Sequence, residues 1–334
     1  MSTLNIGATG IGTAIRRAGP ALLRLAGAAT VLLVLGDRVG AAPFQDGLRA
    51  VTLPGVAAAV AITAATTVCS AWRWRVVARA LGADLPMRAA VGAYYRSQFL
   101  NSVLPGGIVG DVHRAVAHGR QSGDLGRGLR AVAWERSSGQ VVQAVLTGAV
   151  LLALPSPVRP VLPVVLAGAV GVLVCACLVA RTAARRGASR LAAAARTVIG
   201  DVRHGLLARR VWPKLALSSA LVVVGHTAVF LIAARTAGVT APTGDLVALA
   251  MLVQTAMVIP LSVGGWGPRE GVAAWAFAAA GLGAGAGVTA TTVFGVFSLV
   301  AIAPGLVVLL AGAVRSRSVA RPGRYPRALP AKSS

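Results

Sequence analysis

The sequence predicts an all-α, polytopic membrane protein: a helix bundle of about eight transmembrane helices, with two Pro/Gly-broken or re-entrant segments. Three observations lead to this fold class. The mean hydropathy is +0.75, and hydrophobic residues make up 56% of the chain. Only 13% of the residues are charged, well below the roughly 25% typical of soluble domains. Long uncharged stretches recur along the chain, and every second loop between them is basic.

Several stretches are long and apolar enough to cross a bilayer, which takes about 20 residues. Five uncharged stretches qualify directly: 51–72, 137–158, 160–180, 215–234 and 246–268. The stretch 18–36 contains one charge, Arg24, whose long side chain can reach the interface, and we count it as the first span. The uncharged run 271–314 is interrupted by the sequence GLGAGAG, which predicts a short helix followed by a long one. The total is about eight crossings.

The net charge of +24 raises the question of a nucleic-acid partner, but the positions of the basic residues argue against one. They concentrate before the first span, after the second span, between the fourth and fifth spans, and in the tail. By the positive-inside rule both termini are cytoplasmic, in a multi-pass protein of the cell membrane. Trp74, between two arginines after the second span, is typical of a headgroup belt. A signal peptide cleaved after the first apolar stretch is the alternative for the amino-terminal region.

This charge pattern also predicts the domain organisation. We expect three regions: a cytoplasmic lead at 1–17, a transmembrane domain at 18–314, and a basic cytoplasmic tail at 315–334.

The most unusual stretch is FLNSVLPGGIVGDVHR, where a helix-like apolar run is interrupted. Pro105 removes a backbone donor, and Gly106 and Gly107 give the backbone freedom, so the helix should break here. In lipid the freed backbone groups must face a polar cavity or other protein. Three polar residues beside the break are candidate site residues: Asn101, Asp111 and Arg114.

Polar residues continue on both sides of this break. Residues 87–104 should form a half-helix that enters the membrane, with 106–121 as its return, because a full crossing would strand several polar side chains. An amphipathic pair on the cytoplasmic surface is the alternative. The third span opens with Glu135 and Arg136, followed by glutamines at helical spacing. This polar stripe should face protein or water, unless it is only the solvated end of the helix.

A similar pattern returns later in the sequence, in IPLSVGGWGPREG. Pro260 interrupts the helix, Gly264 and Gly265 free the backbone, and the adjacent charges Arg269 and Glu270 follow. Interrupted helices at corresponding positions of two halves are typical of a transport site, so we expect two related four-span halves. A chance resemblance is the alternative, since Pro and Gly are common in membrane helices.

Together with RWR after the second span and WERSSG before the third, these motifs resemble the lysylphosphatidylglycerol synthase transmembrane, or flippase-like, family. The resemblance covers roughly residues 20–315. In two-part members a cytoplasmic synthase attaches an amino acid to phosphatidylglycerol, and the membrane part moves the product outward. Since this chain ends at Ser334, the resemblance implies the translocating half alone, with a separate synthase as a candidate partner.

The resulting hypothesis is a translocator of an anionic or aminoacylated phospholipid, or of a polyprenyl-phosphate-linked lipid. Helix amino ends and freed amides favour a phosphate, which arginines can bind in bidentate fashion. Carboxylates would hold the arginines in place or accept a cationic headgroup. The residues with these two roles are Arg114, Arg136 and Arg269, and Asp111, Glu135 and Glu270.

Two other classes of function remain open from the sequence. One is a membrane-embedded enzyme acting on a polyprenyl phosphate or glycerophospholipid, with Asp111 and His113 or Glu135 as acid and base. The sequence contains no metal triad, nucleophile elbow or nucleotide loop, so we expect no enzyme, catalytic residue, cofactor or metal site. The other class is a non-transporting membrane partner of a separate synthase.

Overall fold

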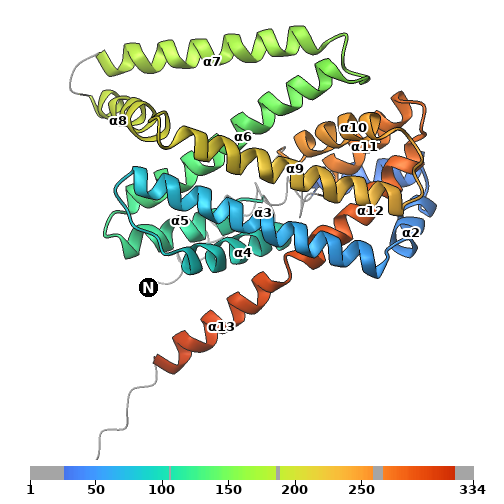
Figure 1. The fold of residues 1–334 in the computed structure, drawn as a ribbon, viewed down its shortest axis with the longest axis horizontal. Helices are drawn as coiled ribbons and strands as arrows, with labels where there is room; N and C mark the ends of the chain where they lie inside the picture. Colours follow the sequence, from blue (N-terminus) through green and yellow to red (C-terminus); the bar gives the residue numbers. More distant parts are fainter. Residues whose placement is uncertain (1–25, 105–106, 186–188, 259–265, 320–334) are drawn as a thin grey trace, which may run out of the picture.

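The computed structural model describes residues 26–104, 107–185, 189–258 and 266–319, and in these ranges every regular element is a helix (Figure 1). The all-α prediction is therefore confirmed. The helices in chain order are the segment Ala26–Arg38, α2 (Ala42–Arg49), α3 (Leu53–Ala80), α4 (Met87–Val103), α5 (Val109–Gln121), α6 (Leu125–Ala153), α7 (Leu162–Arg185), α8 (Arg190–Gly200), the π-helical η1 (Asp201–Leu206), α9 (Trp212–Thr236), α10 (Thr243–Ala256), α11 (Pro268–Ala279), α12 (Ala284–Ala301) and α13 (Pro304–Val319).

The number of membrane crossings is lower than about eight when it is judged by helix length and apolarity. In the part of the chain that the structure describes, four helices qualify: α3, α7, α9 and the continuous stretch Ala284–Gly312 of α12 and α13. A fifth is added if Ala26–Arg38 and α2, which meet at a bend of 99°, form one broken span. The count of about eight is thus not confirmed.

Two of the predicted crossings, 246–268 and 137–158, are not among these four helices, and each has a physical reason. The 14 residues of α10 span only about 21 Å at 1.5 Å per residue, less than the roughly 30 Å of a hydrocarbon core. The 29 residues of α6 are long enough, but the amino-terminal half of α6 carries several charged and amide side chains. The predicted pair of a short helix and a long one after residue 271 is confirmed by α11 and α12.

Among the described residues, α3 contributes to the two largest hydrophobic cores of the bundle. The larger core joins α3 to α9, α10, α11 and α12, where Phe230 packs edge-on against Phe277 and Phe294. The smaller core joins α3 to α4, α5 and α6 around Trp74 and Tyr94. Edge-to-face aromatic pairs add specific geometry to apolar burial. The α4–α5 pair and α11 therefore belong to different cores.

The helix break predicted near residue 105 is present. Helix α4 ends at Val103 and α5 begins at Val109, with Gly107 at a φ of 63° between them; Pro105 and Gly106 lie outside the described residues. The two helices pack against each other, and α4 also packs on α3 while α5 packs on α6. They therefore form a helical hairpin at the smaller core.

The start of α6 is fixed by Asp124, whose carboxylate accepts a hydrogen bond from the backbone N–H of Arg127 at 2.9 Å. This is the usual role of an aspartate at a helix amino terminus. The hydrogen bond lowers the pKa of Asp124. The cap thus sets where α6 begins, directly after the turn that follows α5.

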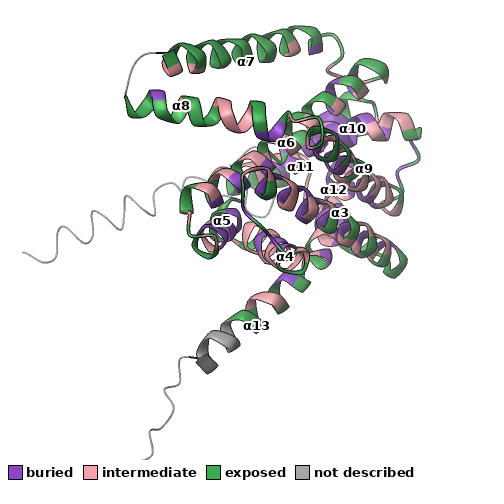
Figure 2. Cartoon of the chain, turned by 60° about the vertical axis from the view of Figure 1, so that its left-hand side comes forward, coloured by how far each residue is buried: buried purple, intermediate pink, exposed green. Residues whose placement is uncertain are grey.

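Helices α7 and α8 stand apart from the rest of the bundle, and α13 extends away from it (Figures 1 and 2). Figure 2 shows α7 almost entirely exposed, and it is the most hydropathic of the four spanning helices. The basic stretch between the fourth and fifth spans is helical in α8 and η1. An apolar helix with so few protein contacts is what a lipid-facing position requires.

The close crossing of α4 and α5 provides a test of this packing. A Cβ atom on Gly110 would lie 2.1 Å from the backbone oxygen of Ser97. We expect Gly110→Ala to lower the apparent midpoint of thermal unfolding, because overpacking costs about 1–3 kcal/mol. The midpoint can be followed by tryptophan fluorescence of the detergent-solubilised protein.

Gly171→Ala in α7 is the matched control, since nothing lies within 4 Å of a Cβ built there. This variant should keep or raise the midpoint, because Ala is favoured over Gly in a helix by about 1 kcal/mol. Equal midpoints for both variants would show that α4 and α5 do not cross as closely as described.

Candidate functional site

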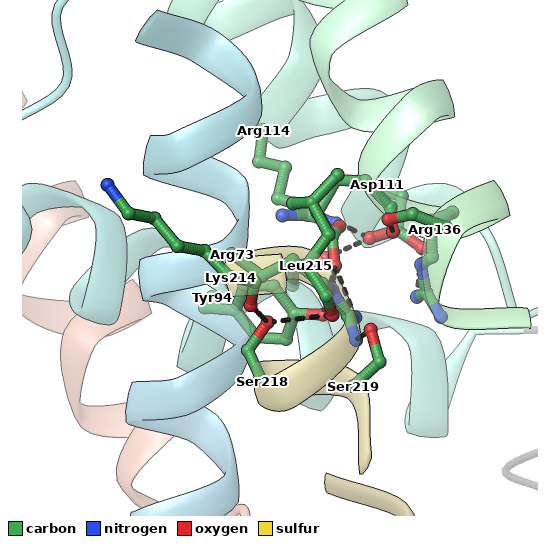
Figure 3. A network of polar contacts seen from close by, with 12 residues as sticks. Arg73, Tyr94, Asp111, Arg114, Arg136, Lys214, Leu215, Ser218 and Ser219 are labelled. Carbon is green, nitrogen blue, oxygen red and sulfur yellow. Dashed lines mark hydrogen bonds and ion pairs between the residues drawn. The ribbon is translucent and has the colours of Figure 1, made fainter. Parts of the chain in front are cut away.

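Five charged side chains from α3, α5 and α6 meet in one cluster, which we call the charge network (Figure 3). Its members are Arg73, Asp111, Arg114, Glu135 and Arg136. Two separate carboxylates organise it, one in α5 and one in α6. The network links helices that are far apart in the sequence, so it fixes their relative positions as well as their charges.

Glu135 is the fully buried centre of the charge network. Its Oε1 accepts hydrogen bonds from Arg73 Nε at 3.0 Å and Nη2 at 2.5 Å, and from the hydroxyl of Tyr94 at 3.2 Å. Its Oε2 accepts one from Arg114 Nη2 at 2.5 Å. Arg73 Nη1 donates to Ser219 Oγ in α9 at 3.0 Å. One carboxylate therefore connects α3, α4, α5 and α6, and reaches α9 through Arg73.

Asp111 is the second acceptor, in the first turn of α5. Its Oδ1 accepts hydrogen bonds from Ser97 Oγ at 2.9 Å and from Arg114 Nε at 3.0 Å. Its Oδ2 accepts one from Asn101 Nδ2 at 3.0 Å and another from Arg136 Nη2. Arg114 thus bridges the two carboxylates, and Arg136 joins α6 to the start of α5.

Asn101 connects the two sides of the helix break, because it lies near the end of α4 and bonds to the start of α5. Its side-chain oxygen accepts the backbone N–H of Gly110 at 2.7 Å, while its amide donates to Asp111. It thereby satisfies one of the free N–H groups at the amino end of α5. The polar residues that the sequence places beside the break are consequently held together across it.

The charge network contains more positive than negative charge. Three guanidinium groups face two carboxylates, so the sum is 3 − 2 = +1. The side chain of Arg136 is 42% exposed, whereas that of Arg114 is fully buried. Since burying unbalanced charge is costly, the excess charge would be offset by an anion that approaches from the side of Arg136.

A cavity of about 250 Å³ lies beside the network, between α3, α4, α5 and α13. Arg114 lines it, with its guanidinium carbon 4.7 Å from the ring centre of Trp74 and 4.4 Å from that of Tyr94. A cation placed above the face of an aromatic ring is attracted to it, so both rings stabilise the guanidinium of Arg114. His118, one turn further along α5, also lines the cavity and packs edge-on against Trp74.

The second interrupted region forms a smaller and electrically balanced unit. Arg269 Nε donates to Glu270 Oε1 at 2.8 Å, and Glu270 Oε2 accepts the backbone N–H of Gly267 at 2.7 Å. The guanidinium of Arg269 lies over Trp266 and Phe294. Both charged side chains are buried, at 1% and 0% exposure. Glu270 therefore caps α11 and neutralises its neighbour at the same time.

The structure brings the predicted site residues together in two groups rather than one. The charge network and its immediate neighbours hold Asn101, Asp111, Arg114, Glu135 and Arg136, with Gly107 at the turn before α5. Arg269 and Glu270 form the second group. Across the described ranges, no hydrogen bond or ion pair joins the two groups. Pro260, Gly264 and Gly265, like Pro105 and Gly106, lie outside those ranges.

Several residues of the site are not apparent from the sequence. Arg73 reads there as a loop residue and Trp74 as part of a headgroup belt, yet both are buried in the structure. His118 is four residues after Arg114 and so shares its helix face, which is a usable signal. Tyr94 and Ser219 give no signal, because nothing in their local sequence indicates a charged partner.

Comparison with known protein families agrees with this architecture. Residues 21–305 match the model of the family described as the lysylphosphatidylglycerol synthase TM region. No individual curated protein matched the sequence. The matched range includes the charge network, the helix break and the Arg269–Glu270 pair, and it covers well over half of the chain. This membrane protein therefore belongs to the lysylphosphatidylglycerol synthase transmembrane-region family.

Proposed function

We propose that this protein translocates a lipid with a phosphate-bearing headgroup across the cell membrane, with both chain termini in the cytoplasm. The observation that carries the proposal is the charge network with its excess positive charge, placed at a broken helix among apolar spanning helices. The family ties the chain to lipid modification in the membrane. A lipid translocator needs a polar route for the headgroup, while the acyl chains stay in the hydrocarbon region.

Arg136 is the residue of the network best suited to receive a headgroup. It combines partial exposure of its side chain with a single ion pair, to Asp111. Its Nε is buried and has no hydrogen-bond partner. A planar guanidinium with a free donor can bind phosphate through charge-assisted hydrogen bonds. The headgroup phosphate would take the place of, or share, the contact with Asp111.

Asp111 has a further role in this proposal, because a translocator must release what it binds. Binding that is too tight would stop transport, just as an ion in a channel must be bound weakly enough to leave its site. Asp111 competes with the phosphate for Arg136 and so limits the strength of binding. Glu135, by contrast, is committed to two buried arginines and holds the frame of the site.

The central test measures lipid movement in proteoliposomes that contain the full chain. Fluorescent phosphatidylglycerol and aminoacyl-phosphatidylglycerol are followed by dithionite reduction of the label in the outer leaflet. We expect Arg136→Gln to slow movement about tenfold or more, because a charge-assisted hydrogen bond contributes about 1.5–3 kcal/mol. Arg136 is partly exposed, so the variant should remain folded.

Arg127→Gln is the matched control on the same helix. Arg127 also pairs with an aspartate, Asp124, and its side chain is 34% exposed. It lies outside the charge network, so its replacement should leave the rate unchanged. If wild-type protein moves neither lipid, the proposed function is wrong. If both variants move lipid at the wild-type rate, the protein translocates lipid but Arg136 is not part of the route.

A second prediction concerns the Arg269–Glu270 pair. Glu270→Gln alone leaves a buried guanidinium unpaired and should lower the free energy of unfolding by about 3–5 kcal/mol. The double variant Arg269→Met with Glu270→Gln removes both charges, and the introduced amide oxygen can still accept the N–H of Gly267. It should therefore unfold closer to the wild type, as measured by thermal denaturation in detergent.

The same double variant tests whether this second region belongs to the transport route. We expect it to lose lipid movement while remaining folded. Wild-type movement by a stable double variant would restrict the pair to a structural role and remove it from the site.

A further inference from the structure

The cavity beside the charge network has an unusual lining, and we call it the basic cavity. Four of its lining residues carry basic side chains, and they come from α4 and α5: Arg88, Arg96, Arg114 and His118. None of the described residues that line it is acidic. The three guanidinium groups carry like charges, and like charges gathered in one partly buried space repel one another and favour an anion between them.

Arg114 is divided between the charge network and the basic cavity. Its Nε donates to Asp111 and its Nη2 to Glu135. Its third nitrogen, Nη1, is buried and has no hydrogen-bond partner. The two carboxylates thus neutralise Arg114 from one side only, and they leave a donor on a residue of the cavity wall.

Three more side chains of the cavity wall also have a buried nitrogen without a hydrogen-bond partner. Trp74 Nε1, Arg96 Nε and His118 Nε2 are also buried without a partner. A buried polar atom with no partner costs about 1–3 kcal/mol, and such atoms are rare in folded proteins. Four of them on the wall of one cavity indicate that an acceptor-rich group belongs there.

The size and position of the basic cavity narrow down that group. At about 250 Å³ it is below the roughly 300–1,000 Å³ typical of drug-sized ligands, so it suits a phosphate with a small substituent rather than a whole lipid. Val308 of α13 forms part of the wall. The nearby apolar residues Val307 and Leu310 of the same helix are exposed, so acyl chains attached to the phosphate would have an apolar surface beside the cavity.

We propose that the basic cavity binds the phosphate of an anionic lipid headgroup, and that it favours an unmodified anionic lipid over one carrying an amino acid. An aminoacyl group adds an ammonium, which would lie among three guanidinium groups with no carboxylate among the described residues of the cavity wall. This inference rests on the proposed function, because it names the class of lipid headgroup that enters the cavity next to the charge network, with which the cavity shares Arg114.

The test measures binding to the full chain in a neutral detergent, by microscale thermophoresis. The probes are dihexanoyl phosphatidylglycerol, its lysyl ester, dihexanoyl phosphatidylcholine and inorganic phosphate. Phosphatidylglycerol should bind at least about tenfold more tightly than the other three, a difference of the size that one charge-assisted hydrogen bond can give. Equal binding of inorganic phosphate would overturn the assignment to a lipid, and equal binding of the lysyl ester would overturn the selectivity.

Two variants locate the binding in the basic cavity. Arg88 is exposed, so Arg88→Glu reverses a charge of the wall without disturbing a buried contact, and Arg96→Gln removes a second one. Each should weaken phosphatidylglycerol binding about tenfold or more. Arg120→Glu makes the same reversal at an exposed position of α5 that does not line the cavity, and it should bind like the wild type. Unchanged binding by Arg88→Glu and Arg96→Gln would exclude the cavity.

The binding and transport measurements separate this inference from the proposed function. If phosphatidylglycerol binds as expected but no lipid moves in proteoliposomes, the cavity is a lipid site in a protein that does not transport. If lipid moves and depends on Arg136 while the cavity variants bind normally, the proposed function stands and the inference about the basic cavity is wrong.

Discussion

The carboxylate of Glu135 is the interaction on which the rest of the site depends. It accepts hydrogen bonds from Arg73, Tyr94 and Arg114, which come from three different helices. A buried carboxylate without partners would be prohibitively costly, and so would the two buried guanidinium groups without it. The positions of α3, α4, α5 and α6 are therefore mutually constrained, and the broken helix pair is held in place by charge as well as by apolar packing.

The sequence predicts those parts of the structure that follow from local chemistry. The break between α4 and α5 follows from the backbone properties of Pro and Gly, and the pairing of Arg269 with Glu270 follows from their adjacency. Arg73 and Glu135 are 62 residues apart, and no periodicity indicates that they meet. The number of long apolar helices differs from the predicted number of crossings because the apolar stretch of α10 forms only a short helix and the amino-terminal half of α6 is polar.

The two interrupted regions look alike in sequence but differ in charge balance. The Arg269–Glu270 pair sums to zero and is sealed, whereas the charge network keeps a net positive charge and a partly exposed arginine. A buried ion pair whose charges cancel attracts a charged ligand only weakly. The two regions can therefore differ in function although their sequence motifs are similar. For the proposed function, this asymmetry favours the α4–α5 region over the Arg269–Glu270 pair as the first contact of a headgroup.

The isolation of α7 has a consequence for how this protein attains its native state. A helix that makes few contacts with its neighbours gains little from tertiary packing, so the energy that keeps it in place comes from transfer of its side chains out of water into hydrocarbon. It can insert and form its backbone hydrogen bonds independently, as the first stage of a two-stage assembly. The information that specifies the tertiary arrangement then resides in the remaining helices, and exchanges among aliphatic residues on α7 should be nearly neutral for folding.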